Sequence, residues 1–108
     1  MTISKTIIEK NSVKKNHETL NTIILGKKGA ETTVRIIDLL FKRPLNVNQI
    51  AEQLGMHYNT ASYHVNLLLE SKLIKKEGGN YGAIYLPAKL LKENIHTYNK
   101  LKAELLKK

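Results

Sequence analysis

The stretch NVNQIAEQLGMHYNTASYHVNLLLES, from Asn46 to Ser71, contains two helical patterns separated by one glycine. Asn46 and Gln49 have the spacing of a capping box, so the sequence predicts that a helix begins here. Gly55 suits the positive φ angle at which many helices end. The apolar positions at helical spacing are Ile50, Ala51 and Leu54 in the first helix, and Ala61, Val65, Leu68 and, as a further candidate, Leu69 in the second. A short helix, a glycine turn and a longer helix over about 58–71 are typical of a helix-turn-helix.

The segment before this stretch predicts another helix, from Glu31 to Arg43. It should end at Arg43, because a residue that precedes proline disfavours the α conformation. Its apolar face would contain Val34, Ile37, Leu40 and Phe41, and Thr32 or Thr33 would cap it. Closer to the N-terminus, residues 1–16 are polar and basic without a clear period, which predicts an arm.

The segment after the stretch predicts a hairpin and a last helix. Leu73–Glu77 has the composition of a short strand, and Gly78-Gly79-Asn80 is a strong turn signal. Tyr81–Leu86 alternates as a second strand. Pro87 suits the first turn of a helix that continues to about Leu106.

Residues 30–86 resemble the winged helix-turn-helix of ArsR-like transcriptional regulators, particularly small archaeal members. The resemblance is carried by Thr33–Leu40 (TVRIIDLL), Pro44–Gly55 (PLNVNQIAEQLG), Tyr58–Leu69 (YNTASYHVNLLL), Leu73–Ile74 and Gly78–Tyr85. It implies a homodimer that binds DNA operators through the second helix of the motif and the hairpin wing. Lys72 stands where the family commonly has glycine after the reading helix.

The expected fold is therefore α+β and mainly α: a winged helix-turn-helix with a two-stranded β-hairpin wing and an added C-terminal helix. We expect a basic N-terminal arm over 1–16, the winged helix-turn-helix domain over 17–86, and a C-terminal dimerisation helix over 87–108.

The charge of the chain indicates a polyanionic partner. The 108 residues carry 18 Lys+Arg against 9 Asp+Glu, a net charge of +9. Lysines concentrate in residues 1–28 and 87–108, whereas the helix-turn-helix between them is nearly neutral. This division suggests that the second helix reads bases while charge elsewhere supplies attraction. The alternative is a merely solubilising surface.

The expected partner is double-stranded DNA. Subtracting the inward positions of the reading helix leaves polar residues in its first turns, where such helices enter the major groove. Asparagine can pair bidentately with adenine, and lysines on the wing can contact phosphate. The expected DNA-binding residues are His57, Tyr58, Asn59, Thr60, Ser62, Tyr63 and Asn66 of the helix, and Lys75, Lys76 and Asn80 of the wing. The alternative is that these residues form an ordinary solvent-exposed surface that binds no DNA.

An apolar stripe on the last helix predicts a homodimer. It would be exposed if the core were complete without it, and contiguous exposed apolar surface usually marks an interface. The expected interface residues are Leu20, Ile23 and Ile24 near the N-terminus, and Leu91, Ile95, Tyr98, Leu101 and Leu105 on the last helix.

The sequence lacks the residues that several other classes of function require. The chain has no cysteine, so thiolate metal sites and disulfides are excluded. Glu93 and His96 could share a helix face, but they do not form a metal site by themselves, and we expect no metal or cofactor. His64 is expected to pack or to bond phosphate.

No motif places a nucleophile beside a base, so we expect no enzyme. No apolar run could span a membrane, and no signal-peptide pattern is present, which favours a cytoplasmic protein.

Two other functions remain open at this point. One is a winged-helix protein–protein interaction module in a larger transcription or replication assembly. The other is structure-selective RNA binding, for which only Tyr81 and Tyr85 offer stacking rings on the sheet.

Overall fold

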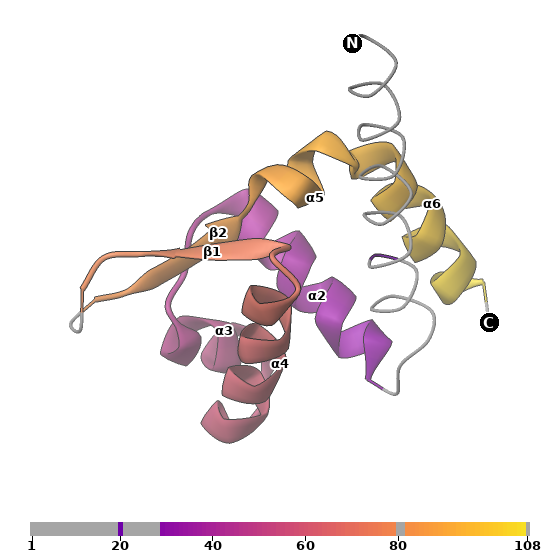
Figure 1. The fold of residues 1–108 in the computed structure, drawn as a ribbon. Helices are drawn as coiled ribbons and strands as arrows, with labels where there is room; N and C mark the ends of the chain where they lie inside the picture. The colour runs from indigo at the N-terminus through magenta and orange to yellow at the C-terminus, as the bar shows by residue number, and fades with distance from the viewer. Residues whose placement is uncertain (1–19, 21–28, 80–81, 108) are drawn as a thin grey trace, which may run out of the picture.

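The computed structural model describes residues 20, 29–79 and 82–107. Its elements, in chain order, are α2 (Ala30–Lys42), α3 (Val47–Leu54), α4 (Tyr58–Glu70), β1 (Ile74–Glu77), β2 (Ile84–Pro87), α5 (Lys89–Glu93) and α6 (Ile95–Leu106). Helices surround α2, and the hairpin of β1 and β2 extends to one side of them (Figure 1). This is the expected mainly helical winged helix-turn-helix. The expected arm over 1–16, Ile23, Ile24 and Asn80 lie outside the described residues.

Helix α2 is the centre of the fold, and it begins earlier than expected. Its N-cap is Gly29, at a φ of 87°, so neither threonine caps the helix. Thr33 lies one turn inside, where its hydroxyl donates to the Gly29 carbonyl at 3.4 Å. Because α2 contacts α3, α4 and β2, its buried surface is wider than one face. It includes Ile36, which the expected face left out, whereas Phe41 is 39% exposed.

The helix-turn-helix forms through the local signals in the sequence. The capping box is present: the Gln49 N–H donates to Asn46 Oδ1 at 2.7 Å, and the Asn46 N–H donates to Gln49 Oε1 at 2.9 Å. Gly55 ends α3 with a φ of 64°. The Met56 N–H then donates to the Ala51 carbonyl at 2.9 Å, which turns the chain into α4. These bonds fix where the second helix of the motif starts.

The wing is a two-stranded antiparallel hairpin that is shorter than expected. Its register pairs Ile74 with Pro87 and Lys76 with Tyr85. Leu45 adds a single bridge to Tyr85, with N–H···O distances of 3.2 and 2.8 Å. The expectation for Pro87 was wrong, because it ends β2 instead of opening a helix. The next N–H, that of Ala88, donates to the Leu73 carbonyl at 2.9 Å, so helix α5 begins only at Lys89.

The C-terminal segment is two helices instead of the single one expected. Asn94 separates α5 from α6 with φ −114° and ψ 30°. Its side-chain amide donates to the Leu90 carbonyl at 2.7 Å. An asparagine that bonds the backbone of the preceding turn competes with the regular helical pattern, which explains the break.

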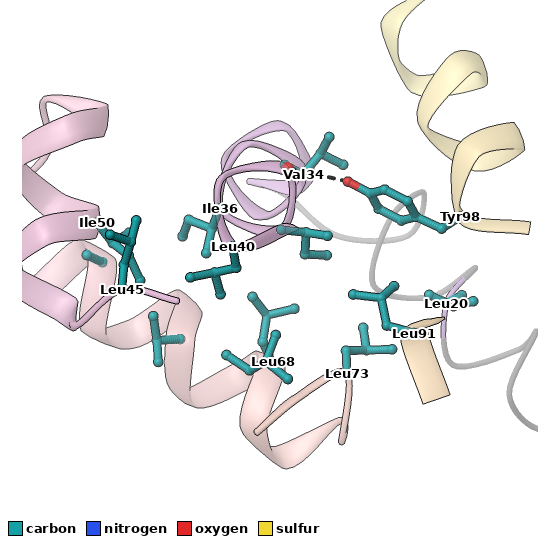
Figure 2. Close-up of a cluster of buried hydrophobic side chains, with 14 of the residues drawn as sticks. Leu20, Val34, Ile36, Leu40, Leu45, Ile50, Leu68, Leu73, Leu91 and Tyr98 are labelled. Atoms are coloured by element: carbon teal, nitrogen blue, oxygen red, sulfur yellow. Dashed lines mark hydrogen bonds between the residues drawn. The ribbon is translucent and has the colours of Figure 1, made fainter. Parts of the chain in front are cut away.

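The hydrophobic core includes the C-terminal helices. Leu20, Leu91 and Tyr98 lie together at one end of it, and Leu45 and Ile50 lie at the other (Figure 2). Leu91, Tyr98 and Leu101 are all buried within the chain. The stripe on the last helix therefore completes the core. In the described parts of the chain, no helix has the length and apolar character needed to cross a bilayer.

Candidate nucleic-acid interface

Helix α4 has one buried face and one polar exposed face. Ala61, His64, Val65 and Leu68 point into the core. On the opposite side, Asn59, Tyr63 and Asn66 are all exposed. Their spacing of four and then three residues puts them in one row along the helix. Thr60 is exposed on one flank of the row, and Ser62 is half-buried on the other. Apart from the half-buried Ser62, the residues predicted to face outward are exposed, and Glu70 at the end of the helix is exposed as well.

Two tyrosines stand out on this helix. Tyr58 is 51% exposed and Tyr63 is 60% exposed, although tyrosine rings usually bury most of their surface. The Tyr63 ring meets the His64 ring edge-on, with centroids 5.3 Å apart and an interplanar angle of 78°. A buried neighbour therefore orients an exposed ring. His57, at the N-cap, is exposed and makes no side-chain capping bond.

His64 attaches α4 to the first turn of α2. Its Nδ1 lies 3.4 Å from the hydroxyl of Thr33. Since that hydroxyl donates to the Gly29 carbonyl, Nδ1 of His64 carries a hydrogen and donates it to the hydroxyl oxygen. Burial lowers the pKa of His64, which favours the neutral ring. His64 is thus a packed histidine, the first of the two roles expected for it.

Gly29 makes this attachment possible, and sequence reasoning missed it. A Cβ at residue 29 would lie 3.1 Å from Cε1 of His64. The positive φ of Gly29 is a second reason for glycine at this position. The sequence did contain a signal for this role, because Gly29 directly precedes a helical pattern.

The wing carries the two expected lysines on different faces. Lys75 and Lys76 are both exposed, and successive strand residues point to opposite sides. Lys75 forms an ion pair with Glu77, with Nζ 3.4 Å from Oε1. An exposed pair of this kind is weak, so it leaves Lys75 able to exchange Glu77 for another anion.

Lys72 joins the reading helix to the wing in a left-handed conformation. Its φ is 62°, and it is the one non-glycine residue with positive φ in the described ranges. Its N–H donates to the Leu69 carbonyl at 3.0 Å, and the Leu73 N–H donates to the Leu68 carbonyl at 3.1 Å. These bonds close the last turn of α4 and set the direction of β1. The lysine thus occupies a conformation that suits glycine, as the resemblance implied.

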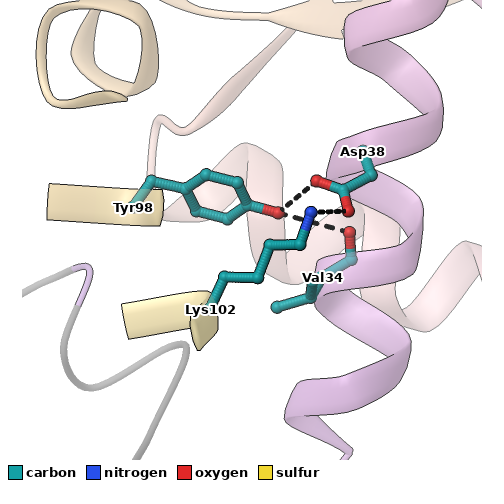
Figure 3. A network of polar contacts seen from close by, with 4 residues as sticks. All are labelled: Val34, Asp38, Tyr98 and Lys102. Atoms are coloured by element: carbon teal, nitrogen blue, oxygen red, sulfur yellow. Dashed lines mark hydrogen bonds and ion pairs between the residues drawn. The ribbon is translucent and has the colours of Figure 1, made fainter. Parts of the chain in front are cut away.

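A polar network attaches α6 to α2, and sequence reasoning missed it too. The Tyr98 hydroxyl lies 2.7 Å from Oδ1 of Asp38 and 3.4 Å from the Val34 carbonyl (Figure 3). Lys102 Nζ lies 2.5 Å from the other carboxylate oxygen of Asp38. Burial, together with the carboxylate of Asp38, raises the pKa of Tyr98, so the hydroxyl keeps its proton and donates it.

This network changes the interpretation of the expected dimer residues. Leu20, Leu91, Tyr98 and Leu101 are buried in the chain itself, so a partner subunit cannot contact them over an open surface. Ile95 and Leu105 are half-buried. Leu106, which the stripe did not include, is 59% exposed.

No group of three or more histidine, aspartate or glutamate side chains lies close enough to hold a metal ion in the part of the chain that the structure describes. Glu93 and His96 are both exposed, on α5 and α6 respectively. The break at Asn94 places them on different helices, so they do not share the helix face that the sequence suggested.

Comparison with known proteins agrees with this geometry. A family model described as a helix-turn-helix domain matches residues 29–77, which span α2, α3, α4 and β1. No curated protein matches the chain.

Several solved structures share the fold. One is the homodimeric winged helix-turn-helix DNA-binding domain of a possible ArsR-family transcriptional regulator from Mycobacterium bovis. It has a TM-score of 0.63 and 20% identity, over 90% of this chain and 81% of that one. The transcriptional regulator HlyU from Vibrio vulnificus has a TM-score of 0.60 and 18% identity, over 98% and 93% of the two chains.

AbfR of Staphylococcus epidermidis has a TM-score of 0.61 and 14% identity, over 95% of this chain and 70% of that one. A further structure shows overoxidized AbfR bound to DNA. At these identities the likeness establishes the fold. This chain therefore contains a helix-turn-helix domain and resembles ArsR-family regulators in its winged helix-turn-helix fold.

Proposed function

We propose that this protein is a homodimeric transcriptional regulator that binds specific double-stranded DNA sequences, without catalysis. The observation that carries the proposal is the exposed row of Asn59, Tyr63 and Asn66 on α4, opposite a fully packed face. A helix of this kind presents directional donors and acceptors, and these are what base edges in the major groove require.

The distribution of charge supports a division between reading and attraction. The net charge is +9, yet α4 has one charged residue, Glu70, at its C-terminal end. Lys75 and Lys76 of the wing are exposed and would contact the backbone phosphates beside the groove. Lysines elsewhere in the chain add attraction that does not depend on sequence.

The proposed dimer uses the C-terminal helices. Leu106 is 59% exposed, and Ile95 and Leu105 pack against the core but are only half-buried, so these three residues leave apolar surface on α6. The Mycobacterium bovis domain, which has the same fold, is described as homodimeric. A two-fold dimer would place two reading helices about 34 Å apart, one turn of DNA. The site would then be an inverted repeat.

The test is selection from a random duplex library at near-physiological salt, followed by sequencing. We expect an enriched inverted repeat with half-sites about 10 base pairs apart. Retention without enrichment would contradict sequence reading and leave a charge-driven binder. No retention would contradict DNA binding and favour the protein–protein module.

Two matched variants locate the reading surface. Asn59→Ala should weaken binding to the selected site by about tenfold, with little effect on random DNA. Gln53→Ala removes a side-chain amide from an exposed position on α3, outside both α4 and the proposed dimer helix, and should leave both affinities unchanged. An equal loss of affinity for the selected site and for random DNA in Asn59→Ala would show that Asn59 does not read the sequence.

A further inference from the structure

The reading helix lacks the side chains that most often recognise guanine and cytosine. Guanine is read most often by arginine or lysine, bidentately through O6 and N7, and cytosine by a carboxylate that accepts from N4. None of these residue types occurs in α4 before Glu70. Glu70 lies eleven residues after Asn59, about 16 Å along the axis at 1.5 Å per residue. It is therefore well beyond the N-terminal turns that enter the groove.

The side chains that α4 does expose match adenine. An asparagine amide offers one donor and one acceptor, which is the pattern needed for N7 and N6 of adenine. Asn59 and Asn66 are exposed and lie in the same row. Neither amide side chain is hydrogen-bonded to any residue within 29–79 or 82–107. Both are therefore available to a base without first breaking a contact in the protein.

The apolar atoms in the same row match thymine. Tyr63 lies between the two asparagines, is 60% exposed, and has its ring oriented by the edge contact with His64. Thr60, an exposed residue on the flank of the row, carries a methyl group as well. The major-groove feature of thymine is its C5-methyl group, which such apolar atoms contact. Adenine-reading and thymine-reading groups thus alternate along one line of the helix.

We infer that the base pairs contacted by α4 are A·T pairs, with adenines bonded to Asn59 and Asn66 and a thymine methyl group against Tyr63. This inference rests on the proposed function and specifies its ligand. The half-site has an A·T core where α4 enters the major groove, and G·C pairs are confined to positions that α4 does not touch.

Base analogues test the inference on the duplex recovered by selection. Replacing the core adenines by 7-deazaadenine removes the N7 acceptor, and we expect affinity to fall by about tenfold for each contacted base. Replacing core thymines by uracil removes the methyl group and should weaken binding by several-fold. Replacing guanines of the same half-site by 7-deazaguanine is the matched control and should leave the affinity unchanged. A G·C core whose binding is lost with 7-deazaguanine would overturn the inference.

A change of specificity gives a second, independent test. Asn59→Arg introduces the guanine-reading side chain, so selection with this variant should recover guanine at one core position of each half-site. Gln53→Arg adds the same charge on α3, away from α4 and the proposed dimer helix, and should strengthen binding to all duplexes without changing the selected sequence. Both positions are exposed, so the fold should survive, and thermal melting checks this.

The outcomes separate the two proposals. An absence of binding to any duplex overturns the proposed function, and the inference falls with it. Sequence-specific binding to a G·C core overturns only the inference. An A·T core that loses affinity equally with 7-deazaguanine and with 7-deazaadenine would also contradict the assigned asparagine contacts.

Discussion

His64 of α4 and Tyr98 of α6 both attach their helix to α2, at the neighbouring residues Thr33 and Val34, but with different chemistry. His64 makes a neutral contact of 3.4 Å, whereas Tyr98 also lies 2.7 Å from a carboxylate that Lys102 neutralises. Helix α6 thus directs polar side chains inward to hold its position. Helix α4 is held mainly by apolar packing, which leaves its polar side chains facing outward.

The largest expected effect comes from removing the Tyr98 ring. Tyr98→Ala should reduce the free energy of unfolding by about 3–5 kcal/mol, because it leaves a cavity beneath α6. Tyr58→Ala deletes the same ring from an exposed position and should change stability by less than about 0.5 kcal/mol. Urea unfolding followed by circular dichroism measures both. Similar losses in the two variants would contradict the assignment of Tyr98 to the core.

Removing single hydroxyls compares the two attachments directly. Tyr98→Phe should reduce the free energy of unfolding by about 1–2 kcal/mol, because the lost hydrogen bond is to a charged group that is partly exposed. Thr33→Val should cost less, about 0.5–1 kcal/mol, since its contact with His64 is long and neutral. Denaturant unfolding measures the loss of unfolding free energy in both variants. A larger loss for Thr33→Val than for Tyr98→Phe would contradict the stronger attachment assigned to α6.

A substitution at Lys72, the junction between α4 and β1, should stabilise the protein. Lys72→Gly should raise the free energy of unfolding by about 1 kcal/mol, because a non-glycine residue at a φ of 62° is strained. Lys100→Gly, inside α6, is the control and should lower it by about 1 kcal/mol. Thermal melting distinguishes the two. A loss in both variants would show that the Lys72 side chain contributes more than its backbone strain.

The smallest effect is a pH dependence of the α4 attachment. Because burial lowers the pKa of His64 from 6.5, the unfolded chain binds this proton more tightly than the folded protein. The free energy of unfolding should therefore be highest above about pH 6.5 and decrease as the pH falls from 6.5 towards the lowered pKa. His64→Gln should remove this part of the slope, and His96→Gln, at an exposed position, should retain it. Urea unfolding between pH 5 and pH 7.5 measures the difference.

The sequence by itself determined the helix-turn-helix and the outward face of α4. The capping box of Asn46 and Gln49 and the turn at Gly55 depend on groups within four residues of each other, and the helical period assigns the faces. The alternation of Asn59, Tyr63 and Asn66 with buried positions could be predicted for the same reason. Local hydrogen bonds and periodicity leave their signals within one or two turns of chain.

Only the tertiary structure decided the role of the last helix and the attachments to α2. An apolar stripe has the same period whether it faces a partner or its own core, so the sequence could not place Leu91 and Tyr98 inside the chain. Tyr98 and Asp38 are 60 residues apart, and His64 and Thr33 are 31 apart. Contacts over such separations depend on how α2 packs against several elements at once. No local pattern encodes that packing, because each pair meets only after the whole core has formed.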